Sequence, residues 1–208
     1  MMRKLNRLVC IISIAIFGVI LGGCSGGSAD KPANVSVDSA KSAPTDSSQY
    51  PLLNSSIANA PIEQLDGSKI KVADRKGNIL LLNLWATWCG PCRAEMPHLV
   101  EMQEKYRPAG FQVLGLDVGD GNGNPESIED IKKFAAKMKL NYELFRITNE
   151  TVGDFYKLTQ FEGVPQTVLV DRQGRVRGVF LGGGERVINT MKQTVDKVIA
   201  ESPAPPGA

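Results

Sequence analysis

Apolar residues recur along the 208-residue chain in short runs, which are separated by turn-forming residues and by stretches with helical periodicity. The run over residues 79–85 is apolar at every position except Asn83, as expected for a central strand that helices cover on both faces. Residues 111–118 are predicted to form a second buried strand. The pattern therefore predicts a sheet whose two central strands are buried on both sides.

Shorter segments complete the predicted fold. Asp66-Gly67 lies between residues 62–65 and 70–72, which is a strong hairpin signal. Further strands are predicted at residues 142–147, 167–170 and 176–180, and the last two should pair as a hairpin across the turn at 171–174. Helices are predicted directly after Cys89, with Pro97 inside, and over residues 125–140, 151–158 and 185–200. This order predicts an α/β sandwich with a mixed sheet and an N-terminal hairpin extension.

Residues 1–23 have the pattern of an export signal. Three basic residues precede an uncharged apolar run over residues 8–21, which is shorter than the roughly 20 residues of a membrane span. Leu21-Gly22-Gly23-Cys24 resembles the bacterial lipobox, in which the cysteine becomes the lipidated first residue of the mature protein. An uncleaved signal anchor is the alternative. Both place the rest of the chain outside the cytoplasm, and Ser25 resembles the signal for sorting to the outer membrane, facing the periplasm, if the cell has two membranes.

A change of composition follows the signal. Residues 25–50 are dominated by Ser, Ala, Gly, Asp, Lys and Pro, so we predict a lipid-anchored flexible linker over residues 24–54. One folded domain should occupy residues 55–202, with order beginning near Ile57, and residues 203–208 should form a tail. Without the three basic residues of the signal, 21 Lys and Arg stand against 22 Asp and Glu, which leaves no basic surface for nucleic acid.

The candidate chemistry lies in Trp88-Cys89-Gly90-Pro91-Cys92, at the end of the first buried strand. Of the four cysteines, Cys10 leaves with the signal and Cys24 carries the lipid, so the folded domain keeps one pair. Residues i and i+3 in a first helical turn have Cα atoms roughly 5 to 6 Å apart, which suits a disulfide. The helix N-terminus stabilises a thiolate, so Cys89 should attack a substrate and Cys92 should resolve the mixed disulfide.

Other uses of a Cys-x-x-Cys pair depend on the ligands around it. A zinc site needs four ligands, and the folded domain offers only His98 besides the two thiols. Haem attachment needs a histidine directly after the second cysteine, where Arg93 stands. A copper-binding module, with two thiolates and His98, remains the non-enzymatic alternative. We otherwise expect His98 to be a solvated helix residue, and we predict neither a metal nor a cofactor beyond the Cys89–Cys92 disulfide.

These motifs together resemble a known family. The Trp-Cys-Gly-Pro-Cys run, Pro97 and a Val-Pro-Gln-Thr segment look like the thioredoxin fold. Asn-Leu-Trp-Ala-Thr-Trp-Cys, followed by residues 93–97, is similar to the TlpA and ResA group of membrane-tethered thiol-disulfide oxidoreductases. The resemblance spans roughly residues 57–200 and implies a thioredoxin-like α/β fold. It also implies a monomer that reduces disulfides in exported proteins such as apocytochrome c, and a membrane thiol-electron donor of the DsbD or CcdA type. A disulfide oxidase or isomerase is the enzymatic alternative.

The resemblance implies further site residues. Pro165 should follow a cis peptide bond and face the redox pair, which would leave the backbone of Val164 free to pair with an extended substrate. Trp88, Gly90 and Pro91 should complete the substrate-binding surface. Because Gly90-Pro91 supplies no cation to stabilise the Cys89 thiolate, we expect a reducing couple, as in thioredoxin at about −270 mV.

The acid-base group is a choice between two carboxylates. Thioredoxin has a buried Asp six residues before its first cysteine, whereas this chain has Asn83, whose amide cannot take a proton. The TlpA and ResA group has a carboxylate in a Val-Gly-Glu-like segment, and Val118-Gly119-Asp120 resembles it. We therefore expect Asp120 to relay the Cys92 proton. The alternatives are that Asp120 only caps a turn and that Glu95 takes the role.

Overall fold

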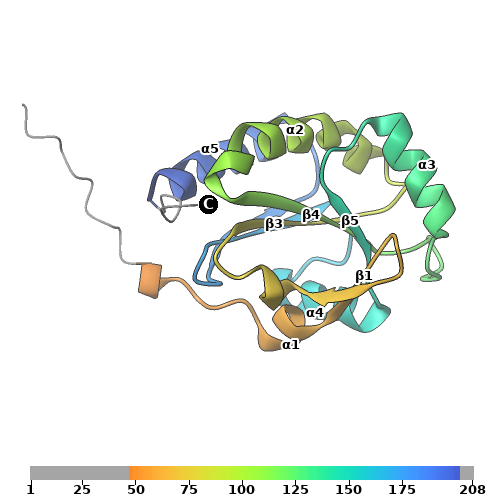
Figure 1. Ribbon diagram of the computed structural model, residues 1–208, viewed down its shortest axis with the longest axis horizontal. Coiled ribbons are helices and arrows are strands. Elements are labelled where there is room, and N and C mark those ends of the chain that lie inside the picture. Colours follow the sequence, from red (N-terminus) through yellow and green to blue (C-terminus); the bar gives the residue numbers. More distant parts are fainter. Residues whose placement is uncertain (1–46, 202–208) are drawn as a thin grey trace, which may run out of the picture. The chain divides into compact units, whose positions relative to one another are not determined.

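The computed structural model describes residues 47–201, whose centre is one seven-stranded mixed sheet (Figure 1). The strands are β1 (Pro61–Gln64), β2 (Lys69–Lys71), β3 (Ile79–Trp85), β4 (Phe111–Asp117), β5 (Glu143–Arg146), β6 (Gln166–Val170) and β7 (Val176–Leu181). Their order is β2-β1-β5-β4-β3-β6-β7. β4 pairs in parallel with β3 and β5, and the other pairs are antiparallel. The predicted mixed sheet and both predicted hairpins are confirmed.

Five α-helices of the described residues cover the two faces of the sheet. They are α1 (Ser55–Asn59), α2 (Gly90–Tyr106), α3 (Ile128–Met138), α4 (Asn149–Thr159) and α5 (Glu185–Glu201). α2, α3 and α5 lie on one face, and α1 and α4 lie on the other (Figure 1). Short 3-10 turns occur at Ser47–Gln49, Val72–Arg75 and Arg107–Ala109. Within residues 47–201, no helix combines the length and the apolar character that a membrane crossing requires.

The alternation of β3 determines what lies under α2. Every residue of this strand is buried. Leu80, Leu82 and Leu84 pack toward α1 and α4, whereas Ile79 and Leu81 pack toward α2 and α5. Successive strand residues point to opposite faces, so Asn83 and Trp85 also point toward α2. A polar amide and an indole N–H are therefore placed in the core beside the helix that carries the cysteines.

The folded part begins earlier than predicted, because residues 50–54 of the expected linker lie on the domain. Leu52 forms an isolated bridge with Arg175, and the Val176 N–H donates to the Pro51 carbonyl at 2.8 Å. Leu53 is buried at 8% exposure. Two adjacent leucines are too short a run to show periodicity, so neither this contact nor α1 could be predicted. The signal, Cys24, the linker up to residue 46 and the tail lie outside the described residues.

The start of α3 is a second correction. We predicted a helix from Pro125, but α3 begins at Ile128. The Ser127 side chain accepts from the Asp130 N–H at 3.1 Å and so caps the helix there. Pro125 and Glu126 consequently belong to the loop after β4. This loop reaches the segment that precedes the cysteines.

Candidate active site

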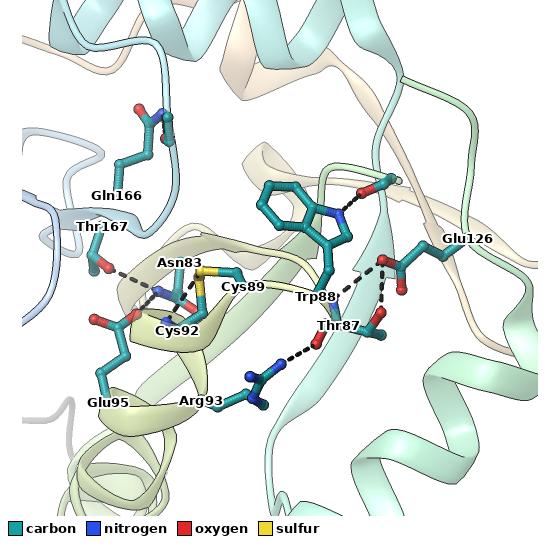
Figure 2. Close-up of a disulfide and its surroundings, with 12 residues drawn as sticks. Asn83, Thr87, Trp88, Cys89, Cys92, Arg93, Glu95, Glu126, Gln166 and Thr167 are labelled. Atoms are coloured by element: carbon teal, nitrogen blue, oxygen red, sulfur yellow. Dashed lines mark hydrogen bonds between the residues drawn. A yellow bond between two sulfur atoms is a disulfide. The ribbon is translucent and has the colours of Figure 1, made fainter. Parts of the chain in front are cut away.

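The two cysteines form a disulfide at the start of α2 (Figure 2). Their Cα atoms are 5.3 Å apart, as the spacing predicted. Cys89 is the N-cap residue of α2, and its sulfur accepts from the Cys92 N–H at 3.1 Å. Cys92 is fully buried, with 0% exposure, one turn inside the helix. The two sulfurs therefore have different surroundings: Cys89 lies at the positive end of the helix dipole and Cys92 in the core.

The loop between β3 and Cys89 is anchored by the loop after β4. Glu126 accepts from the Thr87 N–H at 3.2 Å and from the Thr87 hydroxyl at 2.9 Å. The Arg93 guanidinium donates to the Thr87 carbonyl at 2.9 Å, and the Trp88 indole donates to the Gly119 carbonyl at 3.0 Å (Figure 2). Polar groups of Thr87 are thus held from two sides. The backbone just before Cys89 is fixed by side chains rather than by a strand.

Glu126 was missed by the sequence analysis. A signal was available, because parallel strands end at the same edge of a sheet, so the loops after β3 and β4 must meet. Because we predicted a helix from residue 125, we placed Glu126 in that helix and not in the loop at the sheet edge. The long loop after β4 carries Glu126 back to Thr87.

The Val164–Pro165 peptide bond is cis, as the resemblance implied. Val164 packs against the core cluster that contains Cys89, Cys92 and Met96. Pro165 leads into β6, which pairs with β3, and the Thr167 hydroxyl accepts from the Asn83 amide at 2.9 Å. The pairing of β6 with β3 thus brings the cis-proline segment beside the redox pair.

A groove of about 310 Å³ is lined by Trp88, the residue before Cys89, and by Val164, the residue before the cis-proline. Trp88, Val118, Tyr156 and Val164 contribute apolar surface to it, and Asp120 and Glu162 contribute carboxylates. Trp88 is 51% exposed despite its size. Gly90 and Pro91, which lie between the two buried cysteines in the sequence, are exposed.

The two candidate acid-base residues, Asp120 and Glu95, differ in their hydrogen bonds and in the direction of their pKa shifts. The Asp120 carboxylate accepts from the N–H of Asn122 and of Asn124, both at 2.8 Å, and from the Asn124 side chain at 3.0 Å. These hydrogen bonds, chiefly those from Asn124, hold the pKa of Asp120 below its usual value. Its contacts are those of a loop cap, which was the alternative interpretation, and they favour the ionised form throughout the neutral range.

Glu95 lies one helical turn after Cys92 and is buried at 1% exposure. One carboxyl oxygen accepts from the Asn83 side chain at 2.7 Å, and Figure 2 shows the two side chains pointing toward each other beside Cys92. Burial raises the pKa of Glu95 to about 7, although the hydrogen bond from Asn83 lowers it. A carboxyl with this pKa can both take and return a proton near neutral pH. Of the two candidates, Glu95 has the raised pKa and Asp120 the lowered one.

A second buried carboxyl lies at the end of β4. Asp117 is buried at 1% exposure, and it accepts from the Gly119 N–H at 3.3 Å. Burial, and then the charge of Glu126, raise the pKa of Asp117 to about 7, against the lowering effects of the Gly119 N–H and Arg146. The site therefore has two carboxyls that can be protonated near neutral pH.

No group of three or more His, Cys, Asp or Glu side chains is arranged to hold a metal within residues 47–201. His98 is 41% exposed and lies 3.9 Å from Glu101, its neighbour one turn along α2.

Known proteins with similar sequences are thiol-disulfide oxidoreductases. The chain is 29% identical over 121 residues to the thiol-disulfide oxidoreductase ResA of Geobacillus thermodenitrificans, which covers 58% of this chain and 64% of that protein. ResA of Bacillus subtilis is 28% identical over 124 residues, covering 60% of this chain and 64% of that protein. The match thus spans less than two thirds of the length of these relatives.

Solved structures agree. The thioredoxin domain of a thiol-disulfide oxidoreductase from Bacteroides vulgatus is 26% identical, with a TM-score of 0.54 over 70% of this chain and 99% of that one. A thioredoxin-family thiol:disulfide interchange protein from Chlorobium tepidum is 25% identical, with a TM-score of 0.56 over 71% of this chain and 99% of that one. The predicted thioredoxin-like fold is confirmed. Residues 53–179, more than half of the chain, match the AhpC/TSA family, and the chain belongs to that family.

Proposed function

We propose that the protein is a thiol-disulfide oxidoreductase that reduces disulfides of exported proteins. The observation that carries the proposal is a Cys89–Cys92 disulfide at a helix N-terminus, beside a cis-proline segment and an exposed tryptophan. The names of the relatives point to the same reaction class. The oxidised state of the pair corresponds to the enzyme after one turnover.

In the proposed cycle, the reduced enzyme attacks with the Cys89 thiolate. One substrate sulfur bonds to Cys89, and the other leaves as a thiolate. Cys92 then loses its proton and attacks the Cys89 sulfur, which breaks the mixed disulfide and releases the second substrate thiolate. The substrate has gained two electrons and the enzyme has lost two. The helix N-terminus stabilises the attacking thiolate of Cys89, whereas Cys92 is buried and needs a base.

Glu95 is the proposed base. It lies one turn from Cys92 on α2, and its raised pKa allows it to accept the Cys92 proton and later pass it to a substrate thiolate. Asp120 is engaged by three hydrogen bonds in its own loop, so we give it no proton-transfer role.

Substrate binding is assigned to the groove around Trp88. An extended segment of the substrate would pair with the backbone of Val164, with its disulfide over Cys89 and its neighbouring residues on Trp88, Gly90 and Pro91. Pro165 would fix the position of that backbone. The remaining parts of the proposal follow the family resemblance: apocytochrome c as one substrate, re-reduction by a membrane donor of the DsbD or CcdA type, and a lipid anchor at Cys24.

Trapping tests the assignment of the two cysteines. Cys92→Ser should accumulate substrates as mixed disulfides on Cys89, and the matched variant Cys89→Ser should trap none. Equal trapping by both variants would contradict the roles given to them. Equilibration with glutathione tests the direction: a potential near thioredoxin's, about −270 mV, is expected, and one near that of the oxidant DsbA, about −120 mV, would contradict a reductase.

A kinetic comparison tests the base. Glu95→Gln should slow resolution of a preformed mixed disulfide by about 10²- to 10⁴-fold, the usual loss on removing a general base. Asp120→Asn should resolve it at the wild-type rate, because the Asp120 carboxylate is occupied in its loop. If Asp120→Asn resolves the mixed disulfide slowly and Glu95→Gln resolves it at the wild-type rate, Asp120 is the base.

A further inference from the structure

Four polar side-chain atoms under α2 are buried and have no hydrogen-bond partner among the described residues. They are Asn83 Oδ1, Trp85 Nε1, Glu95 Oε2 and Tyr142 Oη. Two of them, the indole N–H and the phenol O–H, are donors, and two, the amide and carboxyl oxygens, are acceptors. Leaving four such atoms unpaired in a protein core is costly, so a shared partner is expected.

A hydrogen bond, the strand register and the space at Gly115 place these four residues near one another. Asn83 donates to the other oxygen of Glu95 at 2.7 Å and pairs in register with Gly115 on β4. A Cβ atom at Gly115 would lie 3.1 Å from Trp85 Nε1 and 3.2 Å from Tyr142 Cε2. Burial, and then the charge of Glu95, raise the pKa of Tyr142, so its hydroxyl and the Glu95 carboxyl lie within electrostatic reach of each other. The missing side chain at Gly115 lets the indole and the phenol approach the Asn83–Glu95 pair.

We propose that one buried water molecule binds among these residues, accepts from Trp85 and Tyr142, donates to Glu95 and Asn83, and couples Tyr142 to the proton affinity of Glu95. A water molecule has two donors and two acceptor lone pairs, which is the complement of the four unpaired atoms. Buried waters typically make about three hydrogen bonds to polar groups that otherwise lack partners. Tyr142 is thus a positioning residue that acts on Glu95 through this water.

Other groups around Glu95 do not replace Tyr142 in this role. The adjoining strands contribute uncharged Asn83 and Thr167, and α3 contributes apolar side chains to the same core cluster. Asp117 is another buried carboxyl, but the charges that act on it are those of Glu126 and Arg146. On its own helix, Glu95 follows Cys92, which is held in the disulfide of the oxidised protein. The charge of Glu95 raises the pKa of Tyr142, which is why Tyr142 is the side chain assigned to this role.

The sign of the effect follows from which form of Glu95 the donors stabilise. A water polarised by the Tyr142 hydroxyl donates more strongly to a carboxylate than to a carboxylic acid, so it favours the ionised form. Tyr142→Phe removes that hydroxyl and keeps the ring. The pKa of Glu95 should then rise by about one unit, a tenfold change in proton affinity.

The test is a ¹³C NMR titration of the Glu95 carboxyl carbon in the oxidised full-length protein in detergent, with the resonance assigned from Glu95→Gln. Tyr142→Phe should move the midpoint up by about one pH unit. The matched control is Tyr106→Phe, whose hydroxyl bonds to Asp196 on α5, and it should leave the midpoint unchanged. An unchanged midpoint in Tyr142→Phe would overturn the proposal.

A crystal structure of the oxidised protein at high resolution tests the water itself. One ordered water should lie within hydrogen-bond distance of the four atoms, about 2.7 to 3.2 Å. Direct pairing of Tyr142 with Glu95, or the absence of density between them, would rule the water site out. The proposed water site rests on the proposed role of Glu95 as the base, but the two proposals can fail separately. If Glu95→Gln resolves mixed disulfides normally, the base is wrong, and the NMR midpoint still decides the coupling.

Discussion

Replacing Glu95 by Gln should make the stability of the oxidised protein less sensitive to pH. Burial raises the pKa of Glu95 from 4.5 to about 7 in the folded protein. The folded state therefore holds a proton that the unfolded chain releases, so the stabilisation by the protonated carboxyl is complete below pH 4.5 and is lost as pH rises through 7. At about 1.4 kcal/mol per pKa unit, the loss is about 3 kcal/mol. A glutamine at this position cannot titrate, and its side-chain carbonyl can still accept from Asn83.

The assay is urea unfolding of the oxidised wild type and of Glu95→Gln at several pH values between 4 and 8. The variant should gain stability relative to the wild type as pH rises, by about 3 kcal/mol between the two ends of the range. Glu104→Gln, on the same helix but exposed, is the matched control and should follow the wild type. A difference between Glu95→Gln and the wild type that stays constant from pH 4 to pH 8 would refute the reasoning, because it would mean that Glu95 ionises in the folded protein as it does in the unfolded chain.

Two further predictions concern the end of β4. Asp117→Asn should also gain stability relative to the wild type as pH rises from 4 to 8, by up to about 4 kcal/mol, because the pKa of Asp117 is raised from 3.8 to about 7. If urea unfolding gives the same difference in unfolding free energy between variant and wild type at every pH, the prediction is contradicted. Glu126→Ala should cost about 1.5 to 3 kcal/mol of unfolding free energy at pH 7, since both hydrogen bonds to Thr87 are lost, whereas Glu129→Ala, in the first turn of α3, should cost less than about 0.5 kcal/mol. Equal losses in the two variants would show that Glu126 does not anchor the redox loop.

The central elements could be predicted because their signals come from burial alone. Residues 79–85 are apolar except for Asn83, and residues 111–117 carry apolar residues on both faces besides Gln112 and Asp117. Their length and the turn residues at their ends favour buried strands over helices. The redox pair was equally accessible, since an i, i+3 spacing at a helix N-terminus fixes its geometry. The start of α3 was not, because two start signals compete there. Pro125 suits a first turn, but the Ser127 hydroxyl satisfies a backbone N–H that proline cannot.

The choice between Asp120 and Glu95 shows where the sequence is insufficient. Asp120 occupies the position that the family resemblance favours, but local turn chemistry with Asn122 and Asn124 determines its contacts. The sequence around Glu95 indicates only a polar residue on a helix, because its burial depends on strands and helices that are distant in the sequence. Its partner Asn83 is 12 residues earlier, and Tyr142 is 47 residues later. A raised pKa depends on burial, so local pattern could name Glu95 as a candidate but could not rank it above Asp120.

Glu95 and Asp117 lie on different elements, α2 and β4, and their titrations can be separated by single variants. Glu95 lies one turn beyond Cys92 and accepts a hydrogen bond from Asn83. Asp117 lies at the end of β4, where its pKa is raised by the charge of Glu126, and Glu126 accepts a hydrogen bond from Thr87. Neither carboxyl contributes to the raised pKa of the other. In the proposed mechanism, protonation of Glu95 would affect the resolving thiol, and protonation of Asp117 would affect the loop that precedes the attacking thiol. Both have pKa values of about 7, so a single inflection in a pH–rate profile would combine two events, and only the single variants assign each to its step.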